Sequence, residues 1–257
     1  MTVDSCQLTE TQQLKMKVLG IDIGASGVKG AIVDTETGEM ISERLRLVTP
    51  QPATPDAVAK TVKELAKQIG WKDGLIGVGF PAIVRKGVAQ SAANIDKSWI
   101  GTSISEALSK ATKCPVVAVN DADAAGIAAV KFGAGKGKKG VIILLTLGSG
   151  IGSALFLNGE LVPNTELGHF QLEGMIAEHY ASNNARKKFD LSWEEWGKRL
   201  NKYLKIVNRL FSPDLILLGG GVSKKFEKYG KYLTGKMNVK AAELKNDAGI
   251  ILSLIHI

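Results

Sequence analysis

Short apolar runs that end in glycine-rich polar turns recur along this chain. Residues 18–33 form an apolar run, a glycine-rich turn and a second β-rich run, a pattern that predicts a β-hairpin. Residues 141–157 repeat this pattern, and Asn158 with Gly159 adds a strong hairpin turn signal. Two β-hairpins with the same pattern indicate two related lobes that face each other across a cleft.

Helical periodicity appears between the apolar runs. Asp56 is expected to cap an amphipathic helix that ends at Gly70. Ser192 and Glu195 have the spacing of a capping box at the start of a long helix. The apolar positions that this long helix is expected to bury are Trp196, Leu200, Leu204, Val207 and Leu210. Residues 160–190 are expected to be irregular, and the alternation of helices with strands is typical of an α/β fold.

Composition narrows the classes of protein. The chain has 257 residues, of which 45% are hydrophobic, enough for one large domain or two lobes. Cys6 and Cys114 are its two cysteines, which favours a reducing cytoplasm without a disulfide framework. No apolar run approaches the roughly 20 residues of a membrane span, and the polar start lacks a signal-peptide core. We therefore expect a cytoplasmic protein without a membrane partner.

The formal charge of +8 attracts polyanions of any kind, including nucleic acid, a membrane surface, nucleotides and inorganic polyphosphate, although most of the excess lysines are expected to form an ordinary solvated surface. Nucleic acid is not expected among them, because the few aromatic residues do not interleave with basic ones as in a base-stacking surface.

The first hairpin turn has the residue types of a phosphate site. Gly24 and Ser26 allow a tight turn whose N–H groups converge on an anion. Lys29 adds a cation, and Asp22 is a candidate ligand for Mg²⁺ or its water shell. The segment matches neither a dinucleotide-binding glycine motif nor a P-loop.

Two further turns have the same character. The second offers backbone N–H groups and two hydroxyls, through Thr146, Gly148, Ser149, Gly150 and Gly152. The third, formed by Gly219, Gly220 and Gly221, lies between a strand and an expected helix, whose N-terminus would point at an anion. Three such turns at strand ends indicate phosphoryl-transfer chemistry.

Phosphoryl transfer to a hydroxyl also needs a base. Asp121 follows the buried strand 115–119, at the strand end where α/β sites gather. Asn120, Asp121 or Asp123 could equally cap the following helix, and spacing alone does not choose between the two aspartates. Glu166 and His169 have the spacing to reach a polyhydroxylated ligand, although a glutamate and a histidine in a loop are more often ordinary surface residues.

Five motifs, in order, resemble those of the ROK family of sugar kinases. They are the first phosphate motif at 22–29, the catalytic Asn120-Asp121, the second phosphate motif at 146–152, the sugar-binding Glu166-Leu-Gly-His169 and the adenosine-side motif at 218–223. The resemblance runs from about residue 17 to residue 249. Within the family, segments 92–101, 120–126, 191–196 and 246–249 are most similar to the polyphosphate glucokinases.

The resemblance implies a function and a role for each residue. It implies transfer of a phosphoryl group from inorganic polyphosphate, and possible use of ATP, to the 6-hydroxyl of glucose with Mg²⁺. Asp121 would take the hydroxyl proton. Glucose would be held by Asn94, Asn120, Asp121, Glu166 and His169, with Glu178 matching a second sugar-binding glutamate. We also expect a homodimer.

The implied fold is the two-lobed actin-like, hexokinase-type ATPase fold, which is ribonuclease H-like. We expect a disordered leader at 1–15, a small lobe at 16–115 completed by 240–257, and a large lobe at 116–239.

Two departures from the family pattern are visible. No cysteine occurs within 170–181, so no zinc site is expected, and the ending at 251–257 is atypical and should cost stability.

Two other functions fit parts of the pattern. An ATP-dependent sugar kinase would use the same residues. A sugar-sensing repressor would need a DNA-binding domain ahead of the first motif, where about fifteen residues are too few for three helices.

Overall fold

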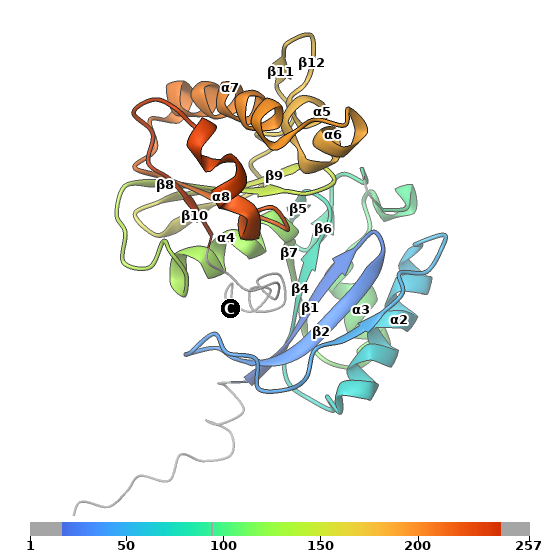
Figure 1. The fold of residues 1–257 in the computed structure, drawn as a ribbon. Helices are drawn as coiled ribbons and strands as arrows, with labels where there is room; N and C mark the ends of the chain where they lie inside the picture. Colours follow the sequence, from blue (N-terminus) through green and yellow to red (C-terminus); the bar gives the residue numbers. More distant parts are fainter. Residues whose placement is uncertain (1–16, 94, 243–257) are drawn as a thin grey trace, which may run out of the picture. The chain divides into compact units, whose positions relative to one another are not determined.

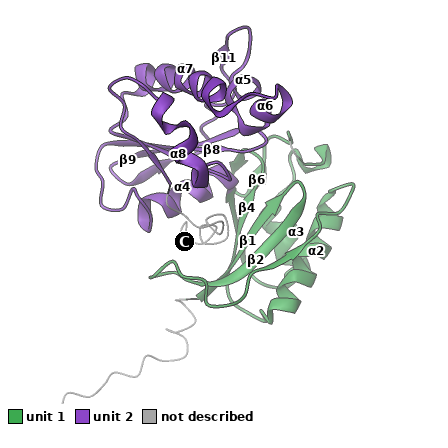
Figure 2. Cartoon of the chain, in the orientation of Figure 1, with its two compact units in different colours: residues 1–119, 250–257 green, residues 120–249 purple. Residues whose placement is uncertain are grey.

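The structure is a computed structural model that describes residues 17–93 and 95–242. The expected leader, Asn94 and the C-terminal ending lie outside these residues. The chain divides into two compact units, coloured separately in Figure 2, with the junction between Val119 and Asn120. The sequence placed this division at 115/116. It lies later because strand β7 (Val116–Asn120) completes the sheet of unit 1.

Unit 1 is built on one five-stranded sheet, visible in Figure 1, with the order β3-β2-β1-β4-β7. Its other strands are β1 (Lys17–Gly24), β2 (Gly27–Asp34), β3 (Leu45–Leu47) and β4 (Ile76–Phe80). β1 and β2 form the first predicted hairpin, β3 continues it antiparallel, and β4 runs parallel to β1. The small ribbon of β5 (Val84–Arg85) and β6 (Val88–Ala89) and the 3₁₀ turn η1 (Lys97–Trp99) complete the unit with its helices.

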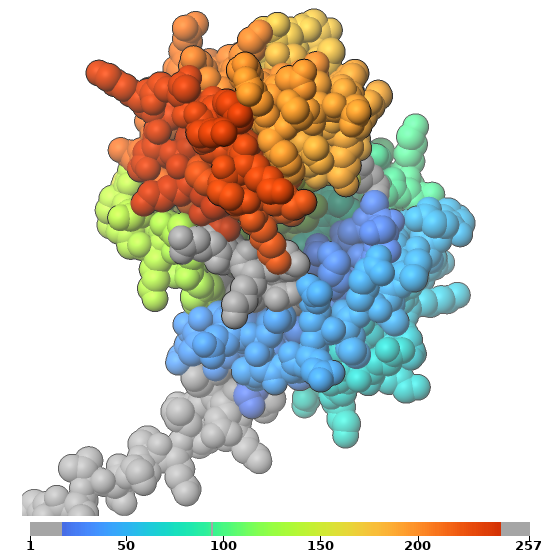
Figure 3. Space-filling model, viewed as in Figure 1, coloured from blue at the N-terminus to red at the C-terminus, as the bar shows by residue number. Residues whose placement is uncertain are grey.

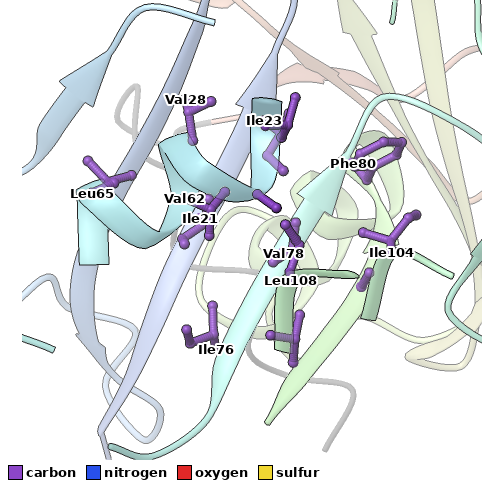
Figure 4. Packing of buried hydrophobic residues seen from close by; sticks show 14 of the residues in the cluster. Ile21, Ile23, Val28, Val62, Leu65, Ile76, Val78, Phe80, Ile104 and Leu108 are labelled. Atoms are coloured by element: carbon purple, nitrogen blue, oxygen red, sulfur yellow. The ribbon is translucent and has the colours of Figure 1, made fainter. Parts of the chain in front are cut away.

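Helices α2 (Pro55–Ile69) and α3 (Ile104–Thr112) form the core of unit 1 with the sheet. Figure 4 shows Val62 and Leu65 of α2 with Ile21, Val28 and Val78 of the strands, all fully buried. The prediction of Asp56 as the N-cap of α2 is wrong by two positions. Thr54 occupies the N-cap position, because Pro55 lacks an N–H and so fits the first helical position.

Unit 2 is built on a second five-stranded sheet, with the order β10-β9-β8-β13-β14. The strands are β8 (Val141–Leu147), β9 (Ile151–Leu157), β10 (Glu160–Val162), β13 (Leu215–Gly219) and β14 (Val239–Ala241). β8 and β9 form the second predicted hairpin, β10 extends it antiparallel, and β13 runs parallel to β8. β14 pairs with β13, so residues 239–241 belong to the unit 2 sheet. The two sheets therefore share one strand order: a hairpin, a third antiparallel strand, and a parallel strand on the other side.

The helices of unit 2 follow the predicted α/β alternation in part. They are α4 (Asp121–Lys131), α5 (Ala177–Ala181), α6 (Asn183–Lys188), α7 (Trp193–Phe211) and α8 (Phe226–Tyr229), with the 3₁₀ turns η2 (Ser223–Lys225) and η3 (Gly230–Tyr232). The irregular stretch expected at 160–190 instead contains β10, the β11 (Gln171–Leu172) and β12 (Met175–Ile176) ribbon, α5 and α6. Elements this short carry too few residues for a periodic signal.

Helix α7 begins with the predicted capping box, in which Ser192 and Glu195 bond reciprocally. The large apolar side chains of its buried face differ from the prediction at two positions. Leu210 is 64% exposed near the end of the helix, whereas Tyr203 is fully buried in the core. In Figure 3, the orange and red segments that include α7 and α8 adjoin on the surface of unit 2, as their contacts require. Within residues 17–93 and 95–242, no helix combines the length and hydrophobicity of a membrane span.

Helix α4 lies unusually close to strand β9. A Cβ atom added at Gly126 would lie 2.5 Å from Cβ of Ala154 and 2.7 Å from Cε2 of Phe156. One added at Gly152 would lie 2.8 Å from Cβ of Ala122. The helix therefore approaches the strand through pairs of very small residues, which places the first turn of α4 next to the second glycine turn.

This close approach predicts whether one substitution stabilises or destabilises the protein. In an open helix, Gly→Ala stabilises by about 1 kcal/mol. We expect Gly126→Ala instead to lower the free energy of unfolding by about 1–3 kcal/mol, because the methyl group overlaps two buried side chains. Urea unfolding measures the change. Ala125→Gly, at the half-buried neighbouring position, is the control and should cost only the propensity term of about 1 kcal/mol. A stabilised Gly126→Ala protein would contradict the packing argument.

Candidate active site

The first glycine turn is the predicted one, at the tip of the β1–β2 hairpin. Gly24 pairs with Gly27, which leaves Ala25 and Ser26 exposed at the tip. Within the described part of the chain, the amides of these two residues donate to no protein acceptor. The hydroxyl of Thr49 donates to the carbonyl of Gly24 at 2.6 Å and braces the turn. The tip therefore presents free N–H groups of the kind that bind an anion.

Three charged side chains form a row across the sheet beneath this turn. Asp22 is the cross-strand neighbour of Lys29, which is in turn the neighbour of Arg46. Nζ of Lys29 lies 3.0 Å from Oδ2 of Asp22, so the predicted phosphate cation and the predicted metal ligand form an ion pair with each other. Arg46 donates from Nη2 to the carbonyl of Ser26 at 2.7 Å.

Arg46 was missed by the sequence analysis. A Cβ atom at Gly27 would lie 2.5 Å from Nε of Arg46, so the absence of a side chain at Gly27 admits the guanidinium against the turn. The alternation Leu45-Arg46-Leu47 shows that Arg46 lies on the opposite face from two apolar residues, but its cross-strand neighbour depends on register.

The second glycine turn, residues 148–150, connects β8 to β9. Two backbone hydrogen bonds hold this turn: the amide of Gly148 donates to the carbonyl of Gly150 at 3.0 Å, and the carbonyl of Gly148 accepts from the amide of Asn184. Among the described residues, the amides of Ser149 and Gly150 meet no protein acceptor. Gly152, also predicted to bind phosphate, lies against Ala122 and Thr146, and its lack of a side chain permits this contact.

The third glycine turn lies beside the second, because Gly219 is the cross-strand neighbour of Thr146. Gly220 has φ of 79°, a conformation that favours glycine, and its Cα approaches the backbone of Leu147. The helix expected after this turn is only a 3₁₀ turn followed by a four-residue α-helix. That part of the prediction is corrected: Gly221 and Lys224 are exposed, but in the part of the chain that the structure describes no long helix follows this turn.

The start of helix α4 separates the roles of three polar residues. Oδ1 of Asn120 accepts the amides of Ala122 and Asp123, at 2.9 and 3.0 Å, so Asn120 is the helix cap. Asp121 is half-buried, and its Oδ1 accepts the amide of Ala122 at 2.8 Å. Asp123 is 2% exposed, and its Oδ2 accepts the amide of Asn164 at 2.8 Å. Asp121 is therefore the accessible carboxylate of the two.

Three predicted sugar-binding residues form a continuous group in unit 2. Nδ1 of His169 lies 3.0 Å from Oε2 of Glu166, and its Nε2 lies 3.9 Å from Oε1 of Glu178. Oε2 of Glu178 accepts the amide of Ile151 at 3.2 Å, directly after the second glycine turn. Burial raises the pKa of Glu166 and the nearby Glu178 adds to this, while His169 acts in the opposite direction.

A buried polar contact holds the loop that carries Glu166. Oγ of Ser153, which is 1% exposed, donates to the carbonyl of Thr165 at 2.6 Å and accepts the amide of Leu167 at 3.0 Å. The hydroxyl of Tyr203 donates to the carbonyl of Leu167 at 3.2 Å. Neither residue was singled out from the sequence, since each lies within a strand or helix pattern that reads as ordinary core.

The structure thus assembles the predicted residues of unit 2 and, separately, those of unit 1. Asn94 lies outside the described residues. Within those residues, no group of three or more His, Cys, Asp or Glu side chains is arranged to hold a metal ion.

Comparison with known proteins shows to which family these motifs belong. Residues 18–187 match the ROK family. The chain belongs to the ROK family. A polyphosphate glucokinase of Mycobacterium tuberculosis (strain CDC 1551 / Oshkosh) is 46% identical over 233 residues, which cover 90% of this chain and 88% of that protein.

Solved structures agree with this ROK assignment. The inorganic polyphosphate/ATP-glucomannokinase from Arthrobacter sp. strain KM superposes with a TM-score of 0.89 at 44% identity, over 93% of this chain and 97% of that one. A ROK family glucokinase from Streptomyces griseus, solved with glucose and AMPPNP, gives a TM-score of 0.77 at 22% identity, over 93% and 98% of the two chains. The predicted hexokinase-type α/β fold is confirmed.

The buried Asp123 of this ROK protein predicts a pH-dependent stability. Burial raises the pKa of Asp123 from 3.8 to about 6, with the Asn164 amide opposing and Glu166 adding to the shift. The folded protein therefore binds this proton more tightly than the unfolded chain, and its stability falls as the pH rises from about 4 to about 6. A shift of about two pKa units corresponds to about 3 kcal/mol.

Asp123→Asn removes this titration. We expect its free energy of unfolding, relative to wild type, to improve by up to about 3 kcal/mol between pH 4 and pH 7.5. Denaturant unfolding at the two pH values measures this change. Asp56→Asn, at an exposed position in the first turn of α2, controls for the loss of one carboxylate. An equal difference at both pH values would show that Asp123 is not the group responsible.

Proposed function

We propose that this protein is a glucokinase that transfers the terminal phosphoryl group of inorganic polyphosphate to the 6-hydroxyl of glucose. One observation carries the proposal beyond family membership. Glu178 contacts both the residue directly after the second glycine turn, through the amide of Ile151, and the Glu166–His169 pair, through Nε2 of His169. A group suited to sugar hydroxyls therefore adjoins a turn suited to phosphate. The 46% identity to a polyphosphate glucokinase supports the donor and the acceptor.

Asp121 is the proposed general base. As O6 of glucose attacks the terminal phosphorus, the bond to the bridging oxygen breaks, and its electron pair leaves with the shortened polyphosphate. The O6 proton passes to the Asp121 carboxylate. Because Asn120 caps helix α4 and Asp123 is buried, Asp121 is the carboxylate at this helix start that remains accessible to a sugar. Glu166, His169 and Glu178 orient the sugar hydroxyls in this proposal, with the amide of Asn120 beside them.

Each unit by itself carries groups suited to phosphate. In unit 2, the amides of Ser149 and Gly150 would stabilise the transferring phosphoryl group, and in unit 1 the amides of Ala25 and Ser26 are suited to bind a phosphate of the donor. Lys29 and Arg46 supply cations beside the first turn. Mg²⁺, when bound to the donor, neutralises phosphate charge. Asp22 is a suitable oxygen ligand, because Mg²⁺ commonly uses one or two carboxylates together with substrate phosphates.

ATP is a second candidate donor, favoured by the third glycine turn, which is exposed beside the second. The Arthrobacter relative is described as using both donors. We further propose that the two units correspond to the two lobes of the fold, and that the enzyme works as a homodimer in the cytoplasm. The low cysteine content supports a reducing compartment, and light scattering of the purified protein tests the dimer.

The first test is glucose 6-phosphate formation with Mg²⁺ and either polyphosphate or ATP. We expect Asp121→Asn to lower kcat by about 10²-fold or more, because a positioned base contributes about 10²–10⁴-fold. Asp190→Asn is the control, since Asp190 is exposed and its positive φ is one that asparagine tolerates. Full activity of Asp121→Asn would reject Asp121 as the base. Activity with ATP alone would reject polyphosphate as the donor.

Arg46 provides a second test of the donor site. We expect Arg46→Ala to raise KM for polyphosphate about tenfold, because a hydrogen bond to a charged group contributes about 1.5–3 kcal/mol. KM for glucose should stay unchanged. Arg85→Ala, at an exposed position in β5, is the matched control for the lost charge. An equal rise in both variants would indicate general attraction of the polyanion and no specific role of Arg46.

A further inference from the structure

Asp123 joins the helix that begins with Asp121 to the loop that carries Glu166. We propose that Asp123 is a positioning residue that sets the affinity for glucose by fixing this loop against α4, an inference that rests on the proposed function. Asp123 lies two residues after Asp121 in the first turn of α4. Its hydrogen bond to the amide of Asn164 reaches a loop 41 residues further along the chain.

The contact is buried and geometrically demanding. Oδ2 of Asp123 accepts the Asn164 amide at 2.8 Å from a side chain that is 2% exposed. Asn164 has φ of 60°, a left-handed conformation that asparagine tolerates better than most residues. The backbone thus turns sharply at Asn164, two residues before Glu166, and directs its amide at Asp123.

The same loop is held from two other elements. Ser153 of β9 bonds to Thr165 and Leu167, and Tyr203 of α7 bonds to Leu167. These bonds hold the loop on the sheet and on the long helix. The hydrogen bond of Asp123 attaches the same loop to α4, so it links the loop of Glu166 to the helix that carries Asp121.

The second oxygen of Asp123 supports a role beyond packing. Within the described residues, Oδ1 is buried and has no hydrogen-bond partner. A buried carboxylate with an unpaired oxygen is costly to the folded state, and most buried polar atoms in proteins are paired. The negative charge of Glu166 adds to this cost. The hydrogen bond that Oδ2 accepts from the Asn164 amide is the contact that offsets part of this cost.

Two substitutions separate the hydrogen bond from the charge. Asp123→Asn keeps an oxygen for the Asn164 amide and removes the charge. Asp123→Ala removes the bond. We expect Asp123→Ala to raise KM for glucose about tenfold or more, since a bond to a charged group contributes about 1.5–3 kcal/mol. Its kcat and its KM for the donor should stay within about threefold of wild type, a small change on this scale.

The Asp123→Asn variant decides between the hydrogen bond and the charge. Asp123→Asn should keep KM for glucose near the wild-type value, and Asp190→Asn controls for loss of an exposed carboxylate without straining the positive φ at that position. If Asp123→Ala does not fold, Asp123→Ser takes its place, because its hydroxyl ends one bond short of the position of Oδ2. Unchanged KM for glucose in the truncated variant would overturn the inference, as would an equal rise in Asp123→Asn. A wild-type protein inactive with both donors would reject the proposed function and this inference with it.

Discussion

The close contact between helix α4 and strand β9 is the constraint on which the candidate site depends. It is made by glycine and alanine on both sides, Gly126 with Ala154 and Ala122 with Gly152. A larger side chain at any of these positions would push the helix away from the sheet. Because Asp121 and Asp123 lie in the first turn of this helix, the spacing of the chemical groups is determined by residues that have no chemical role themselves.

The carboxylates of unit 2 differ in environment, and their roles follow from those differences. Asp123 is enclosed and bonded to a backbone amide, whereas Asp121 keeps access to solvent. Glu178 is shared between an amide next to the glycine turn and the imidazole of His169. The roles proposed for these acidic side chains, as a base, a brace and a sugar contact, rest on these differences between their neighbours.

The local parts of the fold could be predicted from the sequence, and the distant contacts could not. Both hairpins and the α7 capping box rest on neighbouring residues, and they were predicted correctly. Arg46 beside Ser26, Ser153 beside Thr165 and Asp123 beside Asn164 depend on register and tertiary packing, which a single sequence does not display. The prediction of a helix after Gly221 was wrong, because the short elements there leave no periodic signal. Gly152 has a packing role against Ala122 that the sequence did not reveal.

The shared strand order of the two sheets has a consequence for how the chain folds. Each sheet starts from a hairpin of adjacent strands, which closes a short loop and forms on a timescale of about 1–10 μs. All strands of the first sheet come from residues 17–120, so this sheet needs no strand that follows the second hairpin in the chain. The second sheet must wait for β13 and β14, which follow its hairpin only after α5, α6 and α7. During translation, the second sheet is therefore the later of the two to complete its pairing, and its hairpin has the longer exposure of an unpaired strand edge.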